Sequence, residues 1–135
     1  MAEIAPTPAS VLPGANADYY RGIAGGTIVA GTPVYLDATT NRLMGADANG
    51  SLETAEVKGI ALHAASLGQP LRIQTAGDIT IGAAVVLATI YILGASGQLA
   101  PAVDLASGWY CSVVGVAIST TVIRLGILNS RALKA

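Results

Sequence analysis

The side chains that could do chemistry in this sequence are few and lie apart from one another. There is one histidine, His63, and one cysteine, Cys111. A catalytic site needs nucleophilic and titratable groups in a convergent cluster. Ser66 follows His63 closely, but no Gly-x-Ser-x-Gly turn is present to expose a serine nucleophile. The sequence therefore predicts no enzyme, because catalysis would need a buried pocket that joins His63 to an acidic partner.

Metal and cofactor motifs are missing as well. No Cys and His residues have the spacing of zinc ligands. Asp47, Asn49 and Gly50 resemble the start of a calcium loop, but the acidic ligand that should follow is absent, and these residue types are ordinary in turns. The glycines Gly25 and Gly26 are not followed by the Lys-Ser/Thr of a phosphate-binding loop. We therefore expect no cofactor and no bound metal.

The balance of apolar and charged residues favours a subunit of a larger assembly. Hydrophobic residues make up 53% of the 135 residues and charged residues 11%, against about a quarter charged in an average soluble domain. So few charges leave apolar surface that other subunits or a partner would cover. The net charge is −1 and the Lys and Arg residues are scattered. We therefore expect no nucleic-acid partner.

Two pairs of adjacent aromatic residues are the candidates for a subunit interface. They are Tyr19 with Tyr20, and Trp109 with Tyr110. Adjacent residues of a strand point to opposite faces of the sheet. We therefore expect one ring of each pair to enter the core and the other to reach an interface, where Tyr and Trp are favoured.

One uncharged stretch raises the question of a membrane. Residues 79–95 (ITIGAAVVLATIYILGA) carry no charge, but a spanning helix needs about 20 residues. The stretch is rich in Gly and β-branched residues, so we interpret it as two adjoining buried strands. The first residues show no secretory signal, and a single cysteine suits a reducing cytoplasm. We expect no membrane partner.

The elements that position these residues are predicted to be short β-strands around one core. Residues 1–15 are rich in proline, which excludes a helix, and are predicted to form an extended N-terminal arm that docks on a neighbour, with a disordered tail as the alternative. Residues 16–129 are predicted to form one all-β domain, a compact barrel or sandwich, because short strand patterns alternate with turn residues. Residues 130–135 form a predicted C-terminal tail.

An internal repeat divides the predicted domain into two β units, residues 17–75 and 76–128. At one constant spacing Tyr35–Leu36 recurs as Tyr91–Ile92, Leu43 as Leu99, and residues 57–62 (VKGIAL) as 113–118 (VVGVAI). At a second spacing Ala24–Gly25 recurs as Ala76–Gly77, and residues 71–73 as 123–125. Chance similarity in an Ala/Gly/Val-rich chain is the alternative, but the matched order favours duplication. Gly59 and Gly115 are then expected to mark a bulge or a close backbone approach.

Four segments of the sequence resemble the small capsid decoration (cement) proteins of tailed bacteriophages. They are residues 21–37 (RGIAGGTIVAGTPVYLD), 57–62 (VKGIAL), 68–77 (GQPLRIQTAG) and 114–121 (VGVAISTT). The resemblance extends over about residues 17 to 128 and consists mainly of Gly, Ala and turn residues.

The resemblance implies a minor capsid protein of the virion that binds the outside of the head as a homotrimer. Its partner would be the major capsid protein, whose capsomer contacts it would stabilise, after synthesis in the host cytoplasm. In such proteins an N-terminal arm commonly reaches the major capsid protein. The position and character of residues 1–15 suit that role, with Ile4, Val11, Leu12 and Pro13 as anchors.

A head-fibre or surface adhesin module that binds a host receptor or glycan is the alternative function. It would need an exposed polar or aromatic recognition face, and the sequence shows none plainly. Specific glycan binding by the purified protein would favour this alternative.

Overall fold

The computed structural model describes residues 4, 6–94 and 97–134, and it confirms the predicted all-β domain. The described part of the chain contains strands and two short 3-10 helices, and no α-helix. In chain order these elements are η1 Pro8–Ser10, β1 Leu12–Pro13, β2 Asp18–Ile23, β3 Pro33–Leu36, β4 Leu43–Gly45, β5 Gly59–Ala61, β6 Pro70–Thr80, β7 Ile90–Leu93, β8 Leu99–Pro101, η2 Ala102–Asp104, β9 Tyr110–Ala117 and β10 Val122–Leu133.

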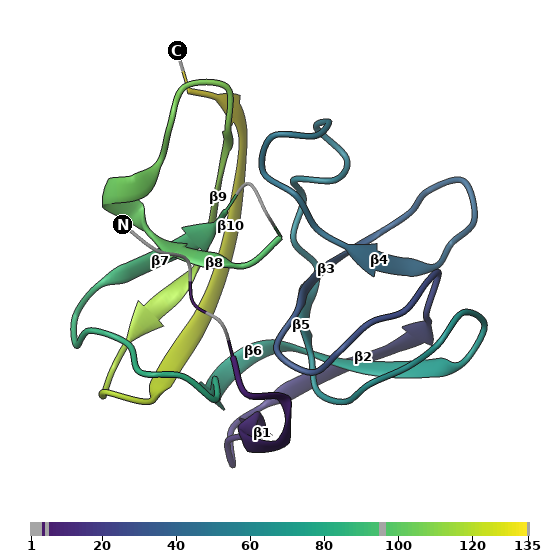
Figure 1. Ribbon diagram of the computed structural model, residues 1–135, viewed down its shortest axis with the longest axis horizontal. Coiled ribbons are helices and arrows are strands. Elements are labelled where there is room, and N and C mark those ends of the chain that lie inside the picture. Colours follow the sequence, from purple (N-terminus) through teal and green to yellow (C-terminus); the bar gives the residue numbers. More distant parts are fainter. Residues whose placement is uncertain (1–3, 5, 95–96, 135) are drawn as a thin grey trace.

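The strands form two antiparallel units that share β6. The first unit, residues 18–75, has the strand order β4-β3-β5-β6-β2. The second unit, residues 76–133, has the order β8-β7-β9-β10-β6. The first half of β6 therefore ends one unit, and its second half begins the other. Figure 1 shows β6 running along the base of both units, with β2–β5 on one side and β7–β10 on the other. The predicted duplication is present in the strand order.

The first unit closes on itself. Ala24, just after β2, forms a bridge to Leu43 in β4. The Gly25 N–H donates a hydrogen bond of 2.8 Å to the Leu43 carbonyl. This closure surrounds a compact core, which we call the first-unit core. Its members are Ala24, Ile28, Val34, Leu43, Ala61, Ala65, Leu71 and Ile73.

A larger core lies between the two units. It joins the inward side chains of the second unit, such as Ile81 and Ile123, to the outer face of the first unit, where Tyr35 and Ile60 lie. We call it the main core. Since one cluster contains residues of both units, the two units stabilise each other by shared apolar burial.

Strand register corrects one residue match within the predicted repeat. Val34 lies opposite Gly59 in the first unit, and Tyr91 lies opposite Gly115 in the second. Tyr91 therefore occupies the place of Val34, and the predicted match of Tyr35 with Tyr91 is wrong by one residue. A one-residue shift moves a side chain to the other face of the sheet. Both glycines lie where a Cβ would overlap a carbonyl oxygen of the next strand, so the expected close approach is confirmed.

A second match is corrected by the hydrogen bonds that follow the first strand of each unit. Ala24 N–H donates to the Gln69 carbonyl at 2.9 Å, and Ile81 N–H donates to the Thr121 carbonyl at 3.1 Å. Ala24–Gly25 therefore corresponds to Ile81–Gly82, and the predicted match with Ala76–Gly77 is wrong. An Ala-Gly dipeptide is too common in this chain to fix the alignment.

The predicted unit boundary between residues 75 and 76 falls inside β6 and is not a linker. Gln74, fully buried there, donates from its amide to the carbonyls of Ala76 and Asp78 at 3.1 and 2.8 Å. These bonds hold β6 where it passes from one unit to the other. The predicted tail is also shorter than expected, because β10 continues to Leu133.

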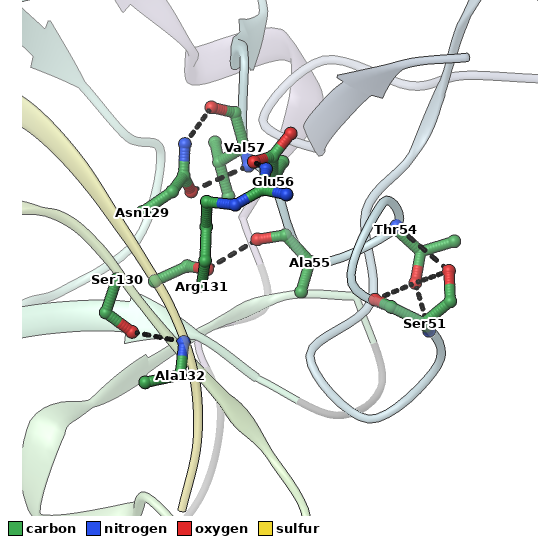
Figure 2. A network of polar contacts seen from close by, with 10 residues as sticks. Ser51, Thr54, Ala55, Glu56, Val57, Asn129, Ser130, Arg131 and Ala132 are labelled. Atoms are coloured by element: carbon green, nitrogen blue, oxygen red, sulfur yellow. Dashed lines mark hydrogen bonds and ion pairs between the residues drawn. The ribbon is translucent and has the colours of Figure 1, made fainter. Parts of the chain in front are cut away.

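The second half of β10 is fastened to residues 56 and 57 of the first unit. The Asn129 side chain accepts from the Val57 N–H at 3.0 Å and donates to the Val57 carbonyl at 3.1 Å. Arg131, which has a positive φ of 58°, forms an ion pair with Glu56. Figure 2 shows both contacts on one side of the segment. We call this group of contacts the latch.

Candidate interaction surfaces

The N-terminal arm lies on the second unit of its own chain. Ile4 N–H donates to the Leu99 carbonyl at 2.7 Å, and Thr7 N–H donates to the Gly82 carbonyl at 2.8 Å. Strand β1 then pairs antiparallel with the end of β6. Val11 is buried in the main core together with Ile4. Over its described residues the arm is therefore extended, as predicted, apart from the short turn of η1.

The arm occupies the place where the first unit closes directly. Gly82 and Leu99 correspond to Gly25 and Leu43, which are hydrogen-bonded to each other in the first unit. In the second unit the carbonyls of Gly82 and Leu99 accept hydrogen bonds from the arm instead, from the N–H groups of Thr7 and Ile4. A Cβ on Gly82 would lie 2.6 Å from the Thr7 carbonyl oxygen, so the two backbones touch there. The arm thus completes the second unit.

The four predicted arm anchors are placed differently from one another. Ile4 and Val11 are buried, and Pro13 is half-buried in β1. Leu12 is 59% exposed. Of the four, Leu12 is the side chain that presents its apolar surface to solvent.

The predicted interface aromatics are also divided. Tyr20 packs against the first-unit core, while its neighbour Tyr19 is exposed, as strand alternation requires. Trp109 packs against the main core, and Tyr110 is half-buried at the start of β9. The structure does not bring these four rings together: the first two lie on β2, and the other two belong to the second unit.

An apolar patch on the second unit was missed by the sequence analysis. Ile90 and Val116 lie opposite each other on β7 and β9, and Ile118 lies two residues beyond Val116. Leu87 adjoins them, since Ala88 N–H bonds to the Ala117 carbonyl. These four side chains are exposed by 60% (Leu87), 46% (Ile90), 39% (Val116) and 38% (Ile118). We call them the second-unit face.

The same positions in the first unit are buried. Register places Ile60 where Val116 lies, and Pro33 where Ile90 lies. Ile60 is fully buried and Leu62, two residues on, is 9% exposed. Both belong to the main core, so the second unit is what covers them. The repeat in the sequence already matches Ile60 with Val116 and Leu62 with Ile118, but it does not show which member of each pair is covered, because the packing of one unit on the other decides that.

The side chains that could act in catalysis or bind a metal ion also lie apart in the structure. His63 is exposed, and Cys111 is a half-buried free thiol. Within residues 4, 6–94 and 97–134, no group of three or more His, Cys, Asp or Glu side chains is placed to hold a metal ion. Across the same residues, no helix is long and apolar enough to span a bilayer.

An ion pair joins the adjacent strands β6 and β10 of the second unit. Arg124 on β10 donates to Asp78 on β6 with an Nε–Oδ1 distance of 2.8 Å. This hydrogen bond lowers the pKa of Asp78 below its ordinary value of 3.8, against a smaller opposing effect of desolvation. The same contact raises the pKa of Arg124.

Comparison of the chain with models of known protein families finds no match, and comparison with curated proteins finds none either.

Proposed function

We propose that this chain is a capsid decoration protein that binds the outside of a tailed-bacteriophage head as a homotrimer and stabilises contacts between capsomers of the major capsid protein. The observation that carries the proposal is the second-unit face. Four large apolar side chains are open to solvent there, although the first-unit counterparts of three of them, Pro33, Ile60 and Leu62, are buried. A chain with so few charges fits a subunit that buries this face in an assembly.

The resemblance of four sequence segments to decoration proteins connects this assembly with a phage head. A trimer that bridges several capsomers adds buried area at each seam. Three copies of each contact act together, so weak single contacts give firm attachment. Leu12, exposed on β1, presents apolar surface of the arm to a partner.

Self-association is tested by sedimentation of the purified protein. We expect a trimer for the wild type and a monomer for Val116→Lys, because a lysine in a buried apolar contact must lose its hydration. Val29→Lys is the matched control, since Val29 is an exposed valine (48%) of the first unit outside this face. A monomeric wild type, or loss of the trimer in the Val29 variant alone, would contradict the assignment.

Capsid binding is tested by adding the protein to heads that lack decoration. We expect density for the chain at the three-fold positions of the shell in electron micrographs, and weaker binding by Leu12→Asp. Heads that show no added density after incubation with folded trimer would refute the decoration role and leave the self-association result intact.

A further inference from the structure

The two units differ in charge at one corresponding pair of residues that face each other on adjacent strands. We call such a cross-strand pair a rung. The second unit has the Arg124–Asp78 ion pair, three residues along each strand from the hydrogen bond between Ile81 and Thr121. The corresponding hydrogen bond in the first unit joins Ala24 to Gln69. At the same distance of three residues along each strand, Arg72 lies opposite Arg21. An arginine therefore stands where the other unit has the aspartate.

Two like charges directly opposite each other destabilise a sheet. Within the described part of the chain, neither arginine forms an ion pair; the ion pairs there join Arg124 to Asp78 and Arg131 to Glu56. The Arg72 guanidinium lies 4.6 Å from the centre of the Tyr19 ring. Stacking holds the guanidinium plane and leaves its edge N–H groups available to an acceptor.

His63 braces the backbone beside these arginines. Its Nε2 accepts the Arg72 N–H at 3.1 Å, and its Nδ1 lies 2.9 Å from the Ala64 carbonyl oxygen. His63 therefore fixes this end of β6.

The same residues line a cavity of about 300 Å³, formed by Arg21, His63, Pro70, Leu71 and Arg72. The lining residues include two arginines, a histidine and two apolar residues, and none of these five is acidic. Arginine matches the two oxygens of a carboxylate or phosphate better than any other side chain. An oxyanion in this cavity would offset the positive charge of Arg21 and Arg72, as Asp78 offsets the charge of Arg124 in the second unit.

We propose that this cavity binds the side-chain carboxylate of an acidic residue on a partner polypeptide. Arg21, His63 and Pro70 are exposed, so the cavity opens to solvent. Sites for free small molecules enclose most of their ligand. A carboxylate on a side chain is already held by its polypeptide, so an open cavity is enough to bind it. The inference is independent of the proposed function, because the isolated protein can be tested.

The test is an NMR titration that follows the arginine Nε–Hε signals of the full chain. The probe is a blocked Gly-Asp-Glu-Gly peptide, the matched control peptide is Gly-Asn-Gln-Gly, and inorganic phosphate is the third arm. We expect saturable shifts at Arg21 and Arg72 with the acidic peptide only. Equal shifts with the amide peptide would overturn the site. Binding of phosphate as tight as that of the acidic peptide would overturn the polypeptide source.

Three variants complete the test. Arg72→Gln should weaken peptide binding at least about tenfold, because a charge-assisted bidentate contact is lost. Arg21→Asp rebuilds the rung of the second unit within the chain, so we expect a folded protein that no longer binds the peptide. Arg42→Gln, on an arginine outside the cavity, is the control and should bind normally. Undiminished binding by the Arg21 variant would overturn the proposal.

Discussion

The two units have one strand order but are completed in two ways. The first unit closes through a direct hydrogen bond from Gly25 to Leu43. In the second unit Gly82 and Leu99 instead accept hydrogen bonds from Thr7 and Ile4 of the arm. The first unit also has its outer face covered, whereas the second leaves that face open. The two units thus share their backbone pairing but differ in which of their surfaces are covered.

Removing the arm is expected to have the largest effect on this comparison. A chain that lacks residues 1–11 loses Ile4 and Val11 from the main core, and burial of two such side chains contributes about 3–5 kcal/mol. We expect denaturation to show a lower free energy of unfolding. Hydrogen exchange should speed up at Ile81 and Val85 of the second unit and stay slow at Ile28 of the first. Unchanged stability would mean that the arm does not complete the fold.

Alanine substitution of the corresponding glycines Gly82 and Gly25 should destabilise the two units by different amounts. Gly82 has a φ of +78° and touches the Thr7 backbone, so Gly82→Ala should cost about 2–3 kcal/mol. At Gly25 a Cβ would meet the flexible Met44 side chain at 2.9 Å, and Gly25→Ala should cost less than about 1 kcal/mol. Thermal or chemical unfolding of both variants gives the comparison.

The same substitution in the chain without its arm provides the control. There Gly82→Ala should lose the part of its cost that comes from the Thr7 contact and keep the part that comes from positive φ, so the two changes are not additive. Additive costs would show that Gly82 and the arm do not interact.

The smallest expected effect is the acid response of the ion pair. The pKa of Asp78 is lowered in the folded state, chiefly by its hydrogen bond to Arg124. The pair therefore stabilises the fold above the ordinary pKa of 3.8, and this stabilisation is lost as the pH falls through the lower folded pKa. Because both side chains are solvated, the effect is small.

Unfolding measured from pH 7 to pH 2 should show a shallower acid decline for Asp78→Asn than for the wild type. Arg21→Asp should add a decline of the same sign in the first unit, because it creates the corresponding pair with Arg72. Identical pH curves for the wild type and the Asp78 variant would contradict the assigned cause.

The sequence predicted the all-β fold, the duplication and the extended arm, because short alternating strands and recurrent glycines carry a local signal. It placed Gly59 and Gly115 correctly, since a close backbone approach permits only glycine there. The repeat register was wrong at Tyr91, because a shared residue type is weaker evidence than the face on which a side chain lies.

Other features depend on contacts that local pattern does not record. Burial of Ile4 and Val11 in their own chain reflects a gap in the second unit, and that gap appears only when both units are assembled. The open second-unit face and the Arg21–Arg72 rung likewise depend on strand register between segments far apart in sequence. The correspondence of Arg21 with Asp78 can be found from sequence only after the repeat is aligned residue by residue.

The latch has a consequence for how further units could be added to the two that are present. Since β6 ends one unit and starts the next, the architecture is that of an open-ended repeat, in which every last strand can begin another unit. Such arrays need a terminal cap. Asn129 and Arg131 fasten the second half of β10 back onto residues 56 and 57, the part of the strand from which a third unit would start. The side chains of the latch therefore hold this half-strand against the first unit of the same chain.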